Sequence, residues 1–277
     1  MVKCRLRDLL RDKIPEGYIN QIPSSYDIIG DTIVIELPHT LRDHWNIICE
    51  TLHKLHKHVR TIYVKTSRVK GEFRVREIKP IWGTKKCYTI HKEYGIKMVV
   101  DVPHVYFNPS LSYEHYRVAG LVNEGEVVYD MFSGVGGFSL HIAYNKSATV
   151  FASDINPNAI ICLALSMIIN KLKGKIIPIL GDSRIIASNI VKNVDRVIMN
   201  LPERSHEFIS SALKCLKEEG GIIHYYHFDY SLDNFLTSFV RGIIMNGGKV
   251  IKILHARSVL EAAPYKYLYV VDAYVSR

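Results

Sequence analysis

Two different patterns of apolar and polar residues divide the chain. Over residues 26–101, short runs of strand character surround a single stretch, residues 44–59, whose apolar side chains recur at helical spacing. Gly71, Gly83 and Gly95 separate the runs. These residues are predicted to form a small α+β domain. The preceding residues 1–25 are too short for a domain and are expected to pack as an arm.

From Gly125 onward, apolar runs of strand length alternate with glycine-containing loops and helical stretches. This succession predicts parallel βαβ units in a mostly parallel, doubly wound sheet. The last two apolar runs, after Gly248, predict two closing strands, which are commonly antiparallel at the edge of such sheets. The expected α/β domain covers residues 102–277.

The positive charge of the chain is concentrated in one segment. The net charge is +9, and residues 54–97 hold thirteen Lys or Arg against three Glu, which is a net of +10. Tyr63, Phe73, Trp82 and Tyr88 are interleaved with these cations. A charge run is often only a solvated face, but a basic segment with aromatic residues favours binding to the phosphates of a nucleic acid.

Composition also argues against several classes of protein. No apolar run approaches the roughly 20 residues that a membrane span needs, and the charged N-terminus does not resemble a signal peptide. A cytoplasmic protein without membrane contact is expected. The five scattered cysteines do not indicate a disulfide framework or a structural zinc site. The histidines at 53, 56 and 58 are interpreted as a basic helix end rather than as metal ligands.

Four successive predicted strands end in residues suited to ligand binding, at the edge where open α/β sheets place their ligands. A glycine loop allows close approach of backbone to a ligand, and an acidic residue after the second strand typically binds ribose hydroxyls. Asp154 and Asp182 can also be helix caps, but four such ends in succession are hard to explain by capping. The candidate residues are Asp130, Phe132, Gly134 and Gly136; Asp154 and Ile155; Asp182 and Ser183; and Asn200, Leu201 and Pro202.

These strand ends resemble the loops with which class I methyltransferases bind S-adenosylmethionine, whereas the three-glycine fingerprint of NAD enzymes is missing. More specifically, the chain resembles the archaeal and eukaryotic tRNA (guanine-37-N1)-methyltransferases from residue 26 to the C-terminus. The matching motifs are SYDIIGD, GEFRVRE, VYFNPSLSYE, VVYDMFSGVGGFS, SDINPNAI, VIMNLPERSHEF, GGIIHYY and APYKYLYVVD. The resemblance implies a Rossmann-like methyltransferase domain preceded by a small domain that binds the anticodon stem-loop of tRNA.

The resemblance also implies roles for individual residues. Glu114 matches the proposed general base that removes the N1 proton of guanine, and Arg74 matches an arginine that can stabilise the charge developing on O6. Asn200 and Pro202 match the acceptor motif that holds the base edge, and Tyr106 matches a tyrosine that can pack against the flipped base. Without the resemblance, the residues themselves favour a phosphate contact for Arg74 and a helix-surface carboxylate for Glu114.

Two departures from the family pattern bear on this prediction. Ser110 stands where the family usually has an arginine, and His115 stands where another basic residue is frequent. The family's separate N-terminal domain is expected to be missing or reduced to residues 1–25. The alternatives are a wyosine-pathway transferase acting on the same nucleotide, by methylation or by aminocarboxypropyl transfer, and an RNA-binding module with a vestigial cofactor fold. The expected oligomeric state is a monomer.

Overall fold

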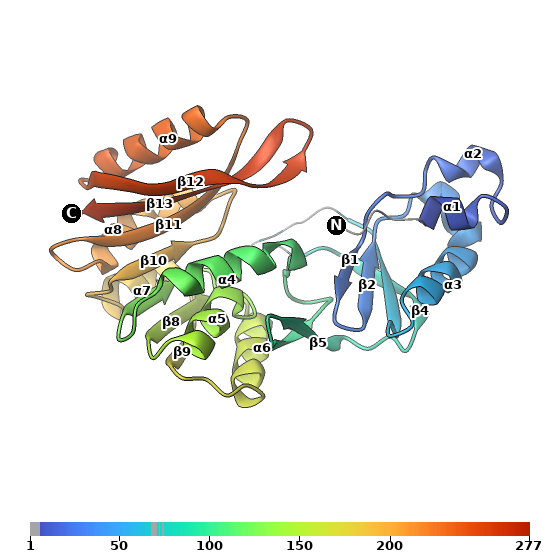
Figure 1. The fold of residues 1–277 in the computed structure, drawn as a ribbon, viewed down its shortest axis with the longest axis horizontal. Helices are drawn as coiled ribbons and strands as arrows, with labels where there is room; N and C mark the ends of the chain where they lie inside the picture. Colours follow the sequence, from blue (N-terminus) through green and yellow to red (C-terminus); the bar gives the residue numbers. More distant parts are fainter. Residues whose placement is uncertain (1–5, 68–70, 72, 74) are drawn as a thin grey trace. The chain divides into compact units, whose positions relative to one another are not determined.

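The computed structural model describes residues 6–67, 71, 73 and 75–277. The chain forms two compact units, Met1–Pro109 and Ser110–Arg277 (Figure 1). Arg74, a predicted site residue, lies outside the described residues. Among the described residues, no helix combines the length and the apolar character that crossing a bilayer requires.

The first unit is an α+β fold built on a four-stranded sheet of order β1-β2-β3-β4. β2 and β3 are parallel, and the two outer pairs are antiparallel. A separate antiparallel hairpin, β5-β6, precedes the end of the unit. The strands are β1 Asp27–Ile29, β2 Thr32–Ile35, β3 Thr61–Lys65, β4 Ile78–Gly83, β5 Tyr88–Glu93 and β6 Ile96–Asp101. The helices are α1 Leu6–Leu10, α2 Glu16–Ile19, η1 His39–His44 and α3 Trp45–Leu55.

One apolar core holds this unit together. The α3 helix buries Ile48 and Leu52 against Ile33 and Ile62 of the sheet, which follows from their spacing on one helix face. The residues predicted to be an N-terminal arm pack into the same core through their apolar side chains. The contributing residues of that segment are Leu6, Leu10, Ile14, Ile19 and Ile22.

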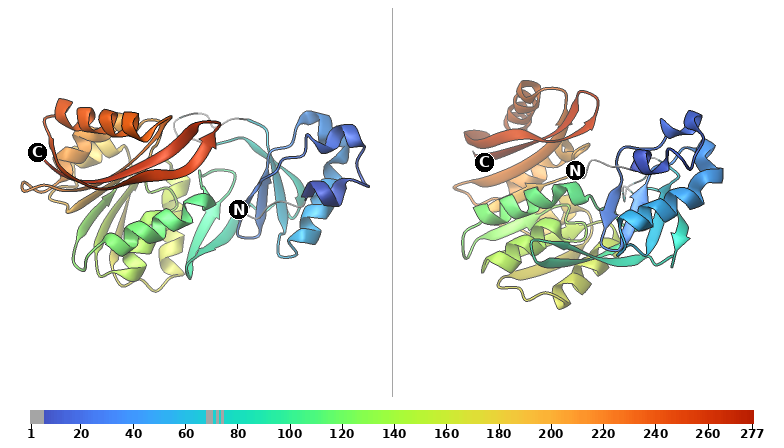
Figure 2. Two further views of the ribbon diagram at one scale, coloured as in Figure 1. Left: turned by 45° about the horizontal axis from the view of Figure 1, so that its top comes forward. Right: turned by 45° about the vertical axis from the view of Figure 1, so that its right-hand side comes forward.

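The second unit contains a seven-stranded sheet of order β12-β13-β11-β10-β7-β8-β9. The five strands from β7 to β11 are parallel, while β12 and β13 are antiparallel and close one edge, as the sequence predicts (Figure 2). The strands are β7 Val127–Asp130, β8 Thr149–Asp154, β9 Lys175–Leu180, β10 Arg196–Met199, β11 Gly221–Asp229, β12 Lys249–Ala263 and β13 Lys266–Ser276. This topology confirms the predicted Rossmann-like fold class.

Helices cover both faces of this sheet. In one layer, α7 contacts β8, α8 contacts β10, and α9 contacts β11, β12 and β13. The apolar core on this side includes Met199, Tyr225, Phe235 and Phe239. The helices α4, α5 and α6 form the other layer, in which α5 and α6 contact β8 and β9. The helices are η2 Pro109–Leu111, α4 Ser112–Leu121, α5 Gly137–Asn145, α6 Pro157–Ile168, α7 Ser183–Asn189, η3 Ser205–Phe208, α8 Ile209–Cys215 and α9 Leu232–Met245.

Candidate active site at the carboxyl ends of the strands

The order of strands in the second unit creates a switch point beside β7. The chain runs from β7 to β8 and β9 on one side, and then returns to β10 and β11 on the other side. In register, Asp130 pairs with Ile198 of β10 and with Ala152 of β8. The carboxyl ends of these parallel strands therefore meet at one edge, which is where open α/β sheets bind their ligands.

Asp154, the last residue of β8, ties the second strand end to the glycine loop. Its Oδ2 accepts a hydrogen bond from the backbone N–H of Gly134 at 2.8 Å, and its Oδ1 accepts one from the backbone N–H of Asn156 at 2.8 Å. Burial raises the pKa of the Asp154 carboxyl, and these backbone donors oppose that rise. Because each carboxylate oxygen has two lone pairs, the group can still accept hydrogen bonds from a diol.

The conformation of the glycine loop requires glycine at two positions. Gly136 precedes α5 with φ 95°, and a Cβ atom there would lie 2.4 Å from Cδ1 of Leu163. Gly134 also has a positive φ, of 52°. The α5 helix begins without a side-chain cap, so its first N–H groups point toward the loop without a side-chain acceptor. Such a helix N-terminus favours polar or negative ligand atoms.

Asp130 lies beneath this loop rather than on its surface. Its side chain is fully buried, and its Oδ2 accepts a hydrogen bond from Ser139 Oγ at 2.6 Å. Its Oδ1 has no hydrogen-bond partner among the described residues. Burial raises the pKa of Asp130 to about 6. This position at the end of β7 supports the loop from below.

Asp182 and Ser183 follow β9, and they differ in accessibility. Asp182 caps α7 by accepting the backbone N–H of Arg184 at 2.8 Å, and the Arg184 side chain lowers the pKa of the Asp182 carboxyl. Ser183 is buried, and its hydroxyl donates to the carbonyl of Met131. Asp182 is thus the member of this pair with a partly exposed carboxylate, while Ser183 supports the first loop.

Two apolar candidates flank the strand ends. Phe132 packs edge-on against Phe208, with ring centroids 4.8 Å apart. Ile155 follows Asp154 and is half-buried.

The Asn200-Leu201-Pro202 segment after β10 is a fixed turn. Ser205 Oγ donates to the carbonyl of Met199 at 3.1 Å and accepts the backbone N–H of Leu201 at 3.2 Å. The carbonyl of Pro202 accepts the backbone N–H of Phe228 on β11 at 3.3 Å. Within this rigid turn, Oδ1 of Asn200 is buried and has no hydrogen-bond partner among the described residues. A buried acceptor without a protein partner is unusual, and such an oxygen can accept a hydrogen bond from a ligand or a water.

Glu114 lies on α4 with 1% of its side chain exposed. Arg117, one turn further along α4, donates to its carboxylate, with Nη2 2.9 Å from Oε2. The hydroxyl of Tyr226 on β11 donates to the same Oε2 at 2.8 Å, and Arg257 on β12 donates through Nη2 to Oε1. Burial and the Glu114 carboxylate raise the pKa of Tyr226 well above its usual range, so its hydroxyl stays protonated.

A series of buried hydrogen bonds and ion pairs continues from Glu114 into the sheet. Arg117 Nη1 donates to Oδ2 of Asp272 on β13 at 2.5 Å, and Asp272 Oδ1 accepts His224 Nδ1 of β11 at 2.6 Å. His224 Nε2 lies 2.9 Å from Nη1 of Arg196, which can only donate, so His224 carries its proton on Nδ1. Although burial opposes it, His224 and Arg117 lower the pKa of Asp272.

The helix that carries Glu114 also contacts the glycine loop. The ring of His115 packs against Phe138, with centroids 4.8 Å apart, and a Cβ atom on Gly137 would lie 2.5 Å from that imidazole. The ring of Phe138 in turn lies 5.7 Å from that of Tyr226. These contacts place the α4 carboxylate and the loop within one packed cluster.

The structure assembles most of the predicted site residues, but not all of them. The strand-end residues and Glu114 belong to the second unit, while Tyr106 belongs to the first unit and is 45% exposed. Sequence reasoning missed Arg117, Arg257, Asp272 and Tyr226. Two signals were present: Glu114 and Arg117 stand three positions apart on a predicted helix, and Asp272 interrupts an apolar run, VVDAYV.

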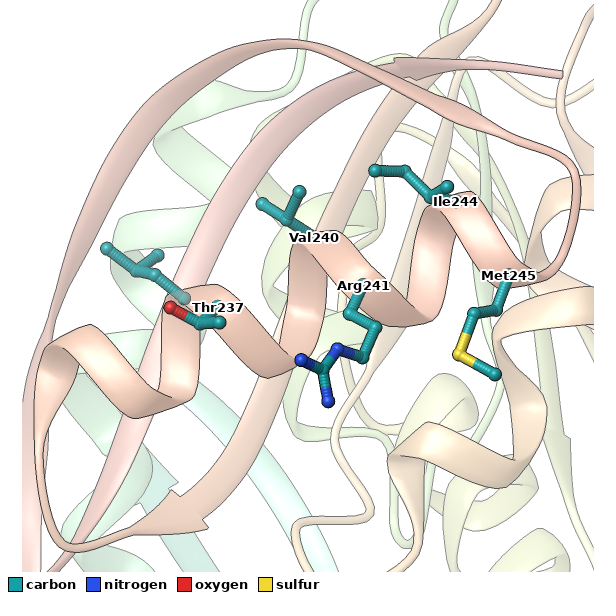
Figure 3. A pocket seen from close by; sticks show the side chains of 6 residues that line it. Thr237, Val240, Arg241, Ile244 and Met245 are labelled. Atoms are coloured by element: carbon teal, nitrogen blue, oxygen red, sulfur yellow. The ribbon is translucent and has the colours of Figure 1, made fainter.

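An apolar groove lies on the second unit along α9 (Figure 3). None of the predicted site residues lines it. Its lining residues are Leu236, Thr237, Val240, Arg241, Ile244 and Met245.

Comparison with known proteins places this geometry in a family. Residues 89–241 match the TRM5/TYW2 methyltransferase domain, and residues 6–86 match the TYW2 N-terminal domain. The tRNA (guanine(37)-N(1))-methyltransferase Trm5b of Pyrococcus abyssi is 40% identical over 95% of this chain and 78% of its own length. Its crystal structure superimposes with a TM-score of 0.84, at 39% identity over 96% of this chain and 79% of that one.

Two further relatives differ in what their names describe. The complex of aTrm5 with tRNALeu has a TM-score of 0.85 and 35% identity, and it covers 99% of this chain and 79% of that one. The tRNA(Phe) (4-demethylwyosine(37)-C(7)) aminocarboxypropyltransferase of Methanocaldococcus jannaschii is 35% identical over 73% of this chain and 77% of its own length. With a family match over more than half of its residues and a relative at 40% identity along nearly its whole length, the chain belongs to the TRM5/TYW2 methyltransferase family.

Proposed function

We propose that this protein transfers a methyl group from S-adenosylmethionine to N1 of guanosine 37 in tRNA. The observation that carries the proposal is the Asn-Leu-Pro turn after β10, whose buried Asn200 Oδ1 has no partner among the described residues. An acceptor held there is suited to a donor on the edge of a purine base. The 40% identity to the P. abyssi Trm5b, which carries that activity in its name, supports the same reaction.

The strand ends after β7, β8 and β9 fit S-adenosylmethionine. Gly134 and Gly136 have positive φ and no side chains, so the backbone of this loop can lie close to a ligand. Asp154 has a half-buried carboxylate that is suited to bind ribose hydroxyls. The carboxylate of Asp182 is suited to accept a hydrogen bond from the adenine amino group. Phe132 and Ile155 are proposed to contact the apolar parts of the cofactor. When bound, S-adenosylmethionine supplies an electrophilic methyl group on a sulfonium sulfur.

The chemical problem is that N1 of guanine carries a proton at neutral pH and is a poor nucleophile. Glu114 is the proposed base: its carboxylate takes the N1 proton, and the electron pair stays on the base. Asn200 orients the base edge, which keeps N1 in line for transfer. Arg74 is proposed to stabilise the charge that moves onto O6, and Tyr106 to pack against the flipped base.

The basic segment of the first unit is proposed to bind the anticodon arm. Lys57, Lys85 and Lys86 are exposed within it, and their charges can neutralise backbone phosphates. The tRNA complex of the relative aTrm5 supports RNA as the partner. We further propose that the protein acts as a monomer in the cytoplasm, and light scattering after gel filtration tests the first of these points.

The experiment is mass spectrometry of nucleosides from a tRNA transcript incubated with the protein and S-adenosylmethionine. The proposal requires 1-methylguanosine at position 37, and a transcript with adenosine 37 is the matched control. Because the wyosine aminocarboxypropyltransferase is also a relative, a tRNA that carries 4-demethylwyosine should be tested in parallel. A product that gains an aminocarboxypropyl group, or methylation of the wyosine precursor alone, would replace our proposal with that activity.

A further inference from the structure

The carboxylate of Glu114 has a different set of partners at each oxygen. Oε2 accepts Tyr226 OH at 2.8 Å and the Arg117 Nη2 at 2.9 Å. Oε1 is held by Nη2 of Arg257, with Nε of Arg117 more distant at 3.2 Å. The two oxygens therefore differ in which side chain would have to leave before a proton could bind.

The partners of Oε2 cannot leave easily. Tyr226 is fully buried, and Arg117 has only 12% of its side chain exposed. Asp272 also holds Arg117 through both Nη atoms, and Asp272 is itself fixed by His224. Breaking any of these bonds would leave a buried charge or donor without a partner, which is strongly destabilising.

Arg257 differs from these partners in exposure. It comes from β12, near the sheet edge, and 30% of its side chain is exposed. Its guanidinium also lies over the ring of Tyr113, at 5.4 Å from the centroid, and Tyr113 is 57% exposed. A guanidinium over an aromatic face keeps a favourable interaction there after a carboxylate is lost. Arg257 thus has both access to solvent and a second contact.

We propose that Arg257 is a positioning residue that holds Oε1 of Glu114 in the resting enzyme and leaves it when the acceptor base binds, so that Oε1 takes the proton. This inference rests on the proposed function. In that step the N1–H bond of guanine breaks, its electron pair stays on N1, and the proton forms an O–H bond with Oε1. Arg117 and Tyr226 meanwhile keep the carboxylate in place through Oε2.

Replacement of Arg257 should change the pH dependence of the reaction in a specific way. The charged and titratable groups that face Glu114 are Arg117 on α4, Tyr226 on β11, Arg257 on β12 and, through Arg117, Asp272 on β13. Removing one nearby cation from a carboxylate favours its protonated form. Because Arg257 holds Glu114 only before the base binds, the acidic limb measured below saturation, which reports the free enzyme, should move to higher pH when Arg257 is neutral. The limb of the saturated rate, which reports the bound complex, should stay where it is.

The test measures the single-turnover rate of 1-methylguanosine formation against pH for wild type, Arg257→Met and Arg257→Lys, at enzyme concentrations well below and well above the Kd for tRNA. Melting temperatures are measured for all three. For Arg257→Met below saturation we expect the acidic limb to move up by about one pH unit, the lower end of the effect of a neighbouring charge. At saturation the limb should stay at its wild-type position, with an alkaline plateau at or above the wild-type rate. Arg257→Lys keeps the cation and should keep the limb close to that of wild type. Arg241→Met, on the exposed face of α9, is the matched control and should leave the profile unchanged.

Each contrary outcome identifies what is wrong. An acidic limb of Arg257→Met that is unmoved below saturation, or that moves equally at saturation, overturns the proposal. A rate that falls at every pH, including the plateau, would show that Arg257 contributes to the reaction directly or structurally rather than by leaving Oε1. Should wild type form no 1-methylguanosine, the proposed function fails first. If wild type is active and only the Arg257 profiles disagree, the function stands and this inference falls.

Discussion

The backbone N–H of Gly134 donates a hydrogen bond to Oδ2 of Asp154 at 2.8 Å. This single contact joins the loop after β7 to the end of β8. It fixes the glycine loop before any ligand is present, because Asp154 also accepts the backbone N–H of Asn156. One carboxylate therefore shapes the loop and offers its remaining lone pairs to a ribose.

Asp154→Ala should weaken binding of S-adenosylmethionine by about 1–3 kcal/mol, the range for buried polar groups that lose a partner. Isothermal titration calorimetry measures this loss. Asp233→Ala, at an exposed position in the first turn of α9, is the control and should bind as wild type does. Unchanged affinity of Asp154→Ala would remove this residue from the cofactor site.

Asp130→Asn should change the pH dependence of stability. Burial raises the pKa of Asp130 from 3.8 to about 6, so the folded protein keeps this proton to higher pH than the unfolded chain does. The wild-type fold therefore loses up to about 3 kcal/mol from this group as the pH rises from about 4 to above 6. The variant lacks this loss, and its unfolding free energy relative to wild type should increase over the same range.

Urea denaturation at a series of pH values tests the sign of that effect. Asp182→Asn is an informative comparison, because Arg184 lowers the pKa of Asp182. The stability that its carboxylate adds is fully present above the unfolded pKa of 3.8 and is lost as the pH falls through the lowered folded pKa. Relative to wild type, Asp182→Asn should therefore change only below about pH 4 and stay flat where Asp130→Asn gains stability. A parallel response of the two variants would contradict the assignment for Asp130.

Glu114→Gln should slow methyl transfer under single-turnover conditions by roughly 10²–10⁴-fold, the contribution of a positioned base. Higher pH should partly restore the rate, because solvent hydroxide can then deprotonate guanine. The structure adds a second consequence: an amide cannot balance Arg117 and Arg257, so the melting temperature should also fall.

The loss of rate and the loss of stability can be distinguished when rates and binding are measured at a temperature at which the variant is folded. Affinities for tRNA and cofactor should then remain near those of wild type. If folded Glu114→Gln reacts at nearly the wild-type rate, the proton leaves by another route, and Asp101 or a water held by Asn200 becomes the next candidate.

Asn200→Ala should separate activity from stability. Because Oδ1 of Asn200 is buried without a partner among the described residues, its removal breaks no hydrogen bond to them. The melting temperature should therefore match or exceed that of wild type, while methyl transfer falls by about 10²-fold through misplacement of the base. A large loss of stability would show that this amide serves the fold instead.

Affinity for tRNA should fall steeply with salt concentration, because phosphate contacts release counterions. Lys65 is a poor probe, since its Nζ lies 2.9 Å from Oδ2 of Asp27 within the sheet. Lys85→Gln combined with Lys86→Gln is better, because both positions are exposed, and it should lower the slope of log affinity against log salt by about 2. Lys192→Gln, an exposed position of the second unit, is the control.

Filter binding or fluorescence anisotropy over a range of salt concentrations gives these slopes. The weakening should be similar for any tRNA, since phosphates carry no sequence information. If the slope of the double variant equals that of wild type, Lys85 and Lys86 do not contact phosphates and their charges are only solvated.

The sequence by itself determined the alternation of strands and helices after Gly125, because hydrophobic periodicity and glycine positions are local properties of the chain. It also determined which residues end the strands, since Asp154, Asp182 and Asn200 each follow an apolar run. Once such strands are parallel, their carboxyl ends must share an edge, so the candidate site follows from local signals alone.

Only the tertiary structure decided what surrounds Glu114. Arg117 is a neighbour on the same helix, but Tyr226, Arg257 and Asp272 come from three neighbouring strands of the sheet that are distant from Glu114 along the chain. Nothing in the spacing of these residues predicts their meeting, because strand order and register arise from packing over the whole unit. The partners of a buried carboxylate are thus set by topology, and they decide which of its two oxygens can accept a proton.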